Sequence, residues 1–276
     1  MQPSYSRVGP RPVRVGAVTY LNARPLTYWL PRLAPDVQIV NDLPSRLADG
    51  LAAGRFDVAL VPAIECFRHP GYRIVSDACV ACDGPVRSIK LYGRVPVGQV
   101  RSLALDEGSR TSAALARILL KERFGLEPKL EPLPIGASLA DSAADAVMLI
   151  GDRGMFPVQG RFEFIWDLGE QWCRWTGLPC VFAVWVADEG VELNGWDATL
   201  AAARDEGVAR FAEIAAIESP LLGIAERECL AYFRDNLRFR LGVREQRGLE
   251  TFCRLAVRHG LVPAGARVVL FDPASA

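Results

Sequence analysis

Short β-rich runs alternate with helix-like segments from Val13 to about Val186, and this alternation constrains the fold more than any other feature of the 276-residue chain. The pattern predicts α/β layers with mainly parallel strands. The clearest helix is predicted over residues 111–123, with Gly125 as its stop and Ser109 or Thr111 as its cap. The predicted strands cover residues 13–18, 37–40, 56–61, 89–93, 102–105, 145–150, 162–166 and 181–186.

After Val186 the pattern changes to amphipathic helices. They are predicted within residues 193–216, 224–237 and 244–260, and no further strand is expected before residues 268–271. The sequence shows no internal repeat and no obvious linker. A second lobe would therefore arise from a chain that crosses between lobes, and not from two domains in series.

Charge and hydropathy limit the partners. The 32 basic and 32 acidic residues give a net charge of zero, which removes the usual electrostatic reason to bind nucleic acid or an anionic membrane surface. No apolar stretch approaches the roughly 20 residues of a membrane helix, and the polar start, broken by Pro and Gly, resembles neither a signal peptide nor a lipid anchor. We expect a cytoplasmic protein with a small-molecule partner, no nucleic acid and no membrane.

The cysteines and histidines do not predict a metal site. Seven cysteines are scattered along the chain, as expected of reduced, partly buried thiols. Cys79 and Cys82 form a CxxC, but a structural zinc needs four ligands, and His69 and His259 are both far away in sequence. A redox-active pair would open a helix, whereas this segment reads as extended, so we interpret the pair as two buried side chains. We predict no metal and no cofactor.

Three strand-to-helix turns are candidate anion sites, because a helix N-terminus presents unpaired N–H groups and a partial positive charge. They lie at residues 19–25, 105–114 and 150–155. Each turn alone is better explained as an ordinary capped helix than as an anion site. None carries a nucleotide-binding fingerprint, and the sequence contains neither a GxSxG elbow nor an HExxH motif.

Taken together, these turns and strands resemble the chorismate dehydratases that open the futalosine route to menaquinone. The Y-L-N-x-x-P, D-G-P-V-x-S and W-T-G-L-P-x-V-F-A strings are specific in combination. The helical last third matches only in type. The matching segments are residues 18–26, 55–65, 76–92, 105–120, 149–155 and 167–185.

This resemblance implies an α/β fold similar to the type 2 periplasmic binding proteins, with two lobes and a ligand cleft between them. The first lobe would hold residues 1–93 plus 188–276, and the second residues 94–187. The implied reaction is loss of the ring hydroxyl and a neighbouring proton from chorismate, which gives 3-[(1-carboxyvinyl)oxy]benzoate. Aromatisation would supply the driving force.

The resemblance also implies the site residues. Asn22 and Ser88 match its motifs and are expected to act in catalysis, because an amide can both donate to and accept from a leaving hydroxyl. Hydroxyls and helix N–H groups suit a dianion. Asp152 could equally be a helix cap. The expected substrate-binding residues are Tyr20, Gly84, Ser109, Thr111, Ser112 and Asp152.

Four arginines, Arg24, Arg87, Arg110 and Arg153, occupy spacer positions of the motifs and are not assigned to the site. Two other functions remain open. One is a non-catalytic carboxylate-binding protein, since fold alone does not decide function. The other is the related lyase that releases dihydroxynaphthoate, which is expected to use a histidine base in the second lobe, whereas residues 94–187 contain no histidine.

Overall fold

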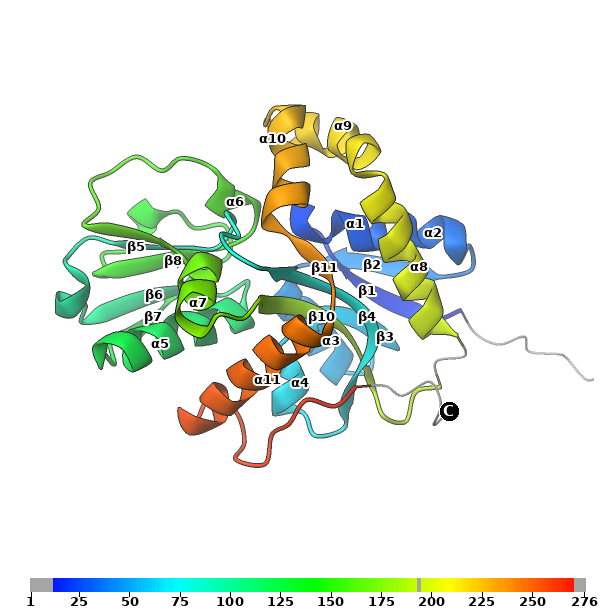
Figure 1. The fold of residues 1–276 in the computed structure, drawn as a ribbon, viewed down its shortest axis with the longest axis horizontal. Helices are drawn as coiled ribbons and strands as arrows, with labels where there is room; N and C mark the ends of the chain where they lie inside the picture. Colours follow the sequence, from blue (N-terminus) through cyan, green and yellow to red (C-terminus); the bar gives the residue numbers. More distant parts are fainter. Residues whose placement is uncertain (1–11, 193–194, 271–276) are drawn as a thin grey trace, which may run out of the picture.

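The computed structural model describes residues 12–192 and 195–270 and places their strands in two separate sheets (Figure 1). The first sheet has six strands in the order β11-β4-β10-β3-β1-β2, and the second has five in the order β7-β6-β8-β5-β9. The first sheet comprises β11 Arg238–Arg240, β4 Tyr72–Cys82, β10 Cys180–Asp188, β3 Val58–Pro62, β1 Arg14–Val18 and β2 Gln38–Asp42. The second comprises β7 Lys129–Leu133, β6 Ser102–Asp106, β8 Ala146–Leu149, β5 Lys90–Gly93 and β9 Phe164–Asp167.

Both sheets are mixed, so the prediction of α/β layers is confirmed but that of mainly parallel strands is wrong. Strand β1 runs parallel to β2 and β3, and β6 runs parallel to β7 and β8. Every antiparallel pair involves β4, β5 or β10, the strands beside the crossings between the sheets. Parallel neighbours need a crossover connection that brings the chain back to the edge of the sheet where the previous strand began. A strand that enters from the other lobe has no such connection, so it lies antiparallel to its neighbours.

All eight predicted strands form, and three further strands appear. Strand β4 is longer than the short extended stretch expected around the CxxC, and β7 was missed because Pro132 and its exposed residues are typical of an edge. Strand β11 lies within the segment expected to be helical. Of the expected strand at 268–271, Leu270 forms a single bridge to Ile74, and residue 271 lies outside the described residues.

The chain changes sheets between Cys82 and Lys90 and again between Asp167 and Cys180. Lobe boundaries were expected after residues 93 and 187, so each is displaced by one strand. Strands β5 and β10 are largely buried apolar runs like their neighbours in sequence, and nothing in their composition shows which sheet they join. The first-lobe ranges also include residues 1–11 and 271–276, which lie outside the described residues.

Helices cover both sheets, and the last third of the chain packs on the first lobe (Figure 1). Helix α5 forms as predicted: Ser109 caps it by accepting a hydrogen bond from the Ser112 N–H, and Gly125 ends it at φ +68°. The α-helices are α1 Arg24–Thr27, α2 Leu30–Leu33, α3 Pro44–Ala52, α4 Glu65–Arg68, α5 Arg110–Phe124, α6 Asp152–Met155, α7 Leu168–Thr176, α8 Trp196–Ala209, α9 Phe211–Leu222, α10 Glu226–Ala231 and α11 Val243–Arg258. Shorter turns are η1 Leu21–Ala23, η2 Val97–Gln99, η3 Leu139–Asp141 and the π turn η4 Tyr232–Asn236.

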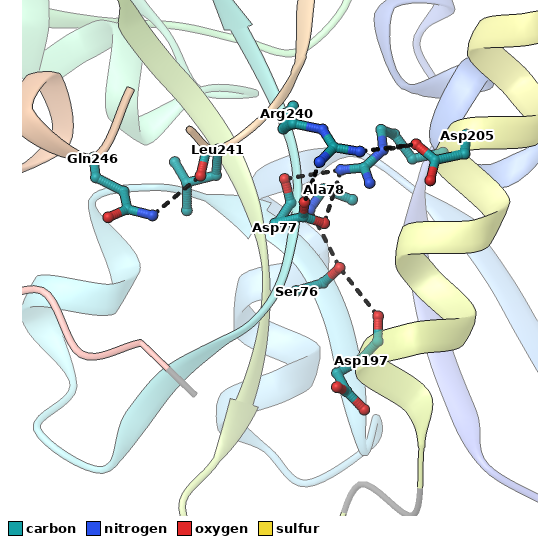
Figure 2. A network of polar contacts seen from close by, with 9 residues as sticks. Ser76, Asp77, Ala78, Asp197, Asp205, Arg240, Leu241 and Gln246 are labelled. Atoms are coloured by element: carbon teal, nitrogen blue, oxygen red, sulfur yellow. Dashed lines mark hydrogen bonds and ion pairs between the residues drawn. The ribbon is translucent and has the colours of Figure 1, made fainter. Parts of the chain in front are cut away.

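A buried arginine links the helical last third to strand β4, within the polar network around Asp77, Asp205 and Arg240 that Figure 2 shows. The Arg204 side chain on α8 is 3% exposed and pairs with Asp77 at 2.8 Å and with Asp205 at 2.7 Å. Arg240 of β11 lies 3.4 Å from the same Asp205 carboxylate. Because a buried guanidinium is costly unless it is paired, this network favours one docking position for α8.

All seven cysteines are free, and Cys79 and Cys82 are fully buried, which confirms their interpretation as buried side chains. No helix in the described ranges is both long and apolar enough to cross a membrane.

Candidate functional site

A cavity of about 40 Å³ lies between the two sheets and brings together residues from distant parts of the chain. A volume of this size holds only a few waters, since one water needs roughly 10–15 Å³. The lining residues are Val18, Tyr20, Asn22, Pro44, Pro62, Val80, Ile89, Ser109, Ser112, Ile150, Gly151, Phe182 and Ala183.

The cavity lies where α/β folds usually bind ligands, beyond the carboxyl ends of parallel strands. Tyr20 and Asn22 follow β1, Pro62 ends β3, and Gly151 follows β8. Pro44 opens helix α3, while Ser109 and Ser112 lie at the start of α5. The N-termini of two helices, one from each lobe, therefore border the same space.

Four of the eight predicted site residues line this cavity: Tyr20, Asn22, Ser109 and Ser112. The first two come from one lobe and the serines from the other. Sequence reasoning thus brought together two segments almost 90 positions apart. The other four, Gly84, Ser88, Thr111 and Asp152, lie outside the lining.

The start of α5 offers hydroxyls and backbone N–H groups to an anion. The Ser109 hydroxyl donates to the Ser112 oxygen at 2.8 Å, and the Ser109 oxygen accepts from the Ser112 N–H at 3.3 Å. With 15 residues, α5 is long enough to develop a full helix dipole. This end of the cavity therefore suits a carboxylate without requiring a charged side chain.

The lobes contact each other around the cavity, so the structure is a closed one. The Asp152 carboxylate of α6 accepts from the Leu21 N–H at 3.0 Å, and the buried Thr111 hydroxyl oxygen accepts from the Ile64 N–H at 3.2 Å. A Cβ on Gly151 would lie 2.6 Å from the Tyr20 ring, so the observed position of this ring requires a glycine at position 151. The cavity of about 40 Å³ can hold a ligand much larger than water only if the lobes separate.

Arg110, the first residue of α5, adds a charged contact between the lobes. It pairs with Asp49 of α3 at 2.6 Å and with Glu65 of α4 at 3.4 Å. The Glu65 side chain is 2% exposed and also pairs with Arg68 and His69. We call this interlobe contact the Arg110 latch.

Asp152 is not a helix cap, because Gly151 occupies that position. Its carboxylate is oriented toward the first lobe instead, and burial raises its pKa to about 6, an effect that the Leu21 N–H partly offsets. Asp152 is therefore a contact between lobes.

Ser88 does not line the cavity, although its neighbour in sequence, Ile89, does. The Ser88 side chain is buried, and its oxygen accepts a hydrogen bond from the Tyr232 hydroxyl at 2.8 Å. Gly84 shapes the same crossing: its φ of +141° suits only glycine, and its carbonyl leaves no room for a side chain at Gly169.

Three of the four unassigned arginines pair with carboxylates. Arg24 binds Glu218 at 2.6 Å, Arg153 binds Asp106 at 2.5 Å, and Arg110 forms the latch. The fourth, Arg87, has a positive φ of 61°. None of them lines the cavity.

The histidines do not approach the cavity either. His69 ends α4, and His259 follows α11, where it lies 2.7 Å from Glu122. Within residues 12–192 and 195–270, no group of three or more His, Cys, Asp or Glu side chains is arranged to hold a metal ion.

A larger cavity of about 350 Å³ lies beside the Arg204 network. Its lining includes Ser76 and Asp77 of β4 and Asp197 of α8, which Figure 2 shows. Its lining, within the described part of the chain, includes none of the predicted site residues. We favour the smaller cavity as the site, because it joins sequence motifs of both lobes.

Sequence reasoning missed two kinds of residue at the site. The apolar wall, for example Val80 and Phe182, consists of strand residues that look like ordinary core. Tyr232 lies 144 positions from Ser88, in a helical segment with no motif. Pro62 and Ile150 could have been predicted as lining residues, since both stand at the carboxyl ends of predicted strands, where α/β folds usually bind ligands.

A family model described as menaquinone biosynthesis matches residues 13–258. The chain is 31% identical over 260 residues to a chorismate dehydratase of Thermus thermophilus, an alignment that covers 88% of this chain and 94% of the relative.

Solved structures with the same fold include a protein of Archaeoglobus fulgidus, with a TM-score of 0.68, 15% identity, and 94% of this chain and 100% of that chain covered. Another is the periplasmic aliphatic sulphonate binding protein of Escherichia coli, with a TM-score of 0.61, 15% identity and coverage of 94% and 96%. At such identities the likeness shows the fold alone. It confirms the predicted two-lobed, periplasmic-binding-protein-like architecture.

Proposed function

This chain belongs to the menaquinone biosynthesis family, and from that premise we propose that it is a chorismate dehydratase, a hydro-lyase that forms 3-[(1-carboxyvinyl)oxy]benzoate and water. The proposal goes beyond the family in naming the substrate and the reaction. We further place the enzyme in the cytoplasm, where reduced thiols are the rule.

The observation that carries the proposal is the meeting of Asn22 and the Ser109/Ser112 pair at one cavity between the lobes. Chorismate has two carboxylates and a neutral ring hydroxyl. The N-terminus of α5 suits one carboxylate, and an amide suits the hydroxyl, because it can donate to the oxygen and accept from the proton. The apolar wall suits the ring.

In the proposed mechanism the enzyme supplies orientation and polarity more than a base. Asn22 hydrogen-bonds the departing hydroxyl, and Ser88 holds the enolpyruvyl carboxylate near the ring carbon that loses its proton. This carboxylate accepts the ring proton while the carbon–oxygen bond breaks and the ring becomes aromatic. The carboxylic acid so formed then passes that proton to the departing hydroxide, which leaves as water. Well-oriented internal reactions are worth roughly 7–11 kcal/mol, so positioning can dominate.

Two features of the structure support a substrate-derived base. Both histidines are remote from the cavity, and Asp152 is occupied with the Leu21 N–H. We propose that no cofactor or metal takes part, since aromatisation drives the loss of water.

Ser88 requires an extension of the cavity, because in this structure its neighbour Ile89 lines the cavity and Ser88 itself does not. We infer that the same opening that admits chorismate brings the Ser88 hydroxyl to its edge. Closure around the ligand then expels water and strengthens the few polar contacts.

The alternative is a protein of the same fold that binds chorismate without converting it. Calorimetry and mass spectrometry on one incubated sample separate the two. Binding with a product lighter by one water supports the dehydratase, whereas binding of unchanged chorismate supports the binding protein and overturns our proposal.

A further inference from the structure

The segment Pro85–Ser88, where the chain first crosses between the lobes, is held from two sides. On one side the Asp167 carboxylate accepts from the Val86 N–H at 2.9 Å and from the Arg87 N–H at 2.6 Å. The same carboxylate caps α7 through the Glu170 N–H at 3.0 Å. The second lobe thus fixes the backbone of this segment.

On the other side, the π turn Tyr232–Asn236 of the first lobe forms hydrogen bonds with both ends of the segment. The Tyr232 hydroxyl donates to the Ser88 oxygen at 2.8 Å, and the Asn236 amide donates to the Pro85 carbonyl at 2.9 Å. A π turn is rare in proteins and frequent at functional sites. Here its first and last residues bind the same four-residue stretch.

The segment is also strained. Arg87 is the only non-glycine residue with a positive φ in the described part of the chain, at 61°. Such a conformation costs roughly 1 kcal/mol or more and persists only where surrounding contacts impose it. The strained turn directs the Ser88 side chain inward, where it is 1% exposed.

The hydrogen bonds determine what the Ser88 hydroxyl can still do. Its oxygen accepts from Tyr232, so its own proton must find an acceptor. In the closed structure that acceptor is the Val86 carbonyl at 3.4 Å, a long contact to an oxygen that already accepts from the Ser88 N–H at 2.8 Å. A carboxylate oxygen would be a far better acceptor.

We propose that Tyr232 is a positioning residue that holds the Ser88 oxygen as an acceptor and so directs the Ser88 proton toward a carboxylate of the substrate. This inference rests on the proposed function, in which Ser88 contacts the substrate. Burial keeps the Tyr232 phenol protonated, because it raises its pKa far above the ordinary value, so the donor persists at every working pH.

The test is a double-mutant cycle of Tyr232→Phe and Ser88→Ala, assayed with chorismate. Tyr232→Phe removes one hydroxyl and should lower kcat about 3- to 10-fold, as for one neutral hydrogen bond, with KM changed less than about 2-fold. In the Ser88→Ala background the same change should have no further effect, because Tyr232 acts through Ser88. An equal loss in both backgrounds, or no loss in the wild-type background, overturns the proposal.

Tyr92→Phe is the matched control, since Tyr92 is also a buried tyrosine, 3% exposed, but packs on Phe162 in the second lobe. It should leave kcat and KM unchanged. If Tyr232→Phe does not fold, Asn236→Ala takes its place: it removes the hydrogen bond at the other end of the segment and should lower kcat only while Ser88 is present. An effect of Asn236→Ala that is independent of Ser88 counts against the proposal.

The cycle also works if the proposed function fails. Should the wild-type protein bind chorismate without converting it, the Kd for chorismate replaces kcat in the same cycle. Coupling between Tyr232 and Ser88 in Kd then supports the positioning role and leaves only the reaction in error. Additive effects on Kd overturn the positioning role as well.

Discussion

The Asp152 carboxylate of one lobe accepts a hydrogen bond from the Leu21 N–H of the other at 3.0 Å. Leu21 follows Tyr20 and precedes Asn22, two residues that line the cavity. Asp152 therefore holds the first-lobe side of the site in place when the lobes are closed. The contact is made by a largely buried carboxylate, whose pKa burial raises to about 6.

Asp152→Asn is expected to stabilise the fold at neutral pH. Asparagine keeps an acceptor for the Leu21 N–H and removes the desolvation of a charge. A pKa raised from 3.8 to about 6 corresponds to at most roughly 3 kcal/mol, so we expect a gain of about 1–3 kcal/mol in the free energy of unfolding. Urea denaturation at pH 7.5 measures it.

The pH dependence of this gain has a definite sign. Between about pH 4 and 6 the folded protein holds the Asp152 proton and the unfolded chain does not, so wild-type stability falls as the pH rises. The advantage of Asp152→Asn should therefore grow from pH 4 to 6 and stay constant above. A variant less stable than wild type at pH 7.5 would refute this interpretation.

The turnover of Asp152→Asn should fall by less than 10-fold. If turnover is abolished while the affinity for chorismate is retained, Asp152 is the base.

Disrupting the Arg110 latch should weaken substrate binding by favouring the open state. We expect Arg110→Gln to raise the Kd for chorismate about 2- to 10-fold, with a smaller effect at high salt because charged contacts are screened. Arg117→Gln is the control: it removes the same charge two turns further along α5. Equal affinities for wild type and Arg110→Gln would show that the latch has no role in closure.

Closure itself can be measured by small-angle scattering. The wild-type radius of gyration should decrease when chorismate saturates the protein, and Arg110→Gln should be larger without ligand. An unchanged wild-type radius would count against ligand-driven closure.

Asn22→Ala and Ser88→Ala are each expected to lower turnover by about one to three powers of ten, as for loss of one polar contact made in the transition state. Steady-state kinetics should show a reduced kcat for both. The relative sizes of the losses in turnover matter. If Ser88→Ala has almost no effect and Asp152→Asn is inactive, the base is a protein carboxylate.

Activity should survive exhaustive chelation. Among the residues that the structure describes, no donor cluster suits a metal, and the proposed chemistry needs none. Loss of activity with a chelator, restored by one divalent ion, would contradict the proposal.

The sequence predicted the site where polar residues follow strands, and failed where tertiary contacts decide. Tyr20, Asn22, Ser109 and Ser112 stand at turns between an apolar strand and a helix, so the edge of the sheets that they share could be inferred. Ser88 was placed by its motif alone. Its burial depends on the strained Arg87 turn and on Tyr232, which strand alternation does not reveal.

The fold was predictable for similar reasons. The spacing of hydrophobic residues and the composition identified eight strands and the cap of α5, because strand formation and helix capping depend on local sequence. They could not assign β5 and β10 to the correct sheet, since an apolar strand of nine residues such as β10 is equally suited to either core. The short strand β11 forms only because β4 offers it an edge.

The most direct test of this account is incubation of the purified protein with chorismate, followed by mass spectrometry and by aromatic absorbance over time, with Asn22→Ala in parallel. The account predicts a product lighter by one water, with aromatic absorbance, formed about 10- to 1,000-fold more slowly by the variant. Chorismate recovered unchanged from a folded wild-type protein that binds it would contradict the account.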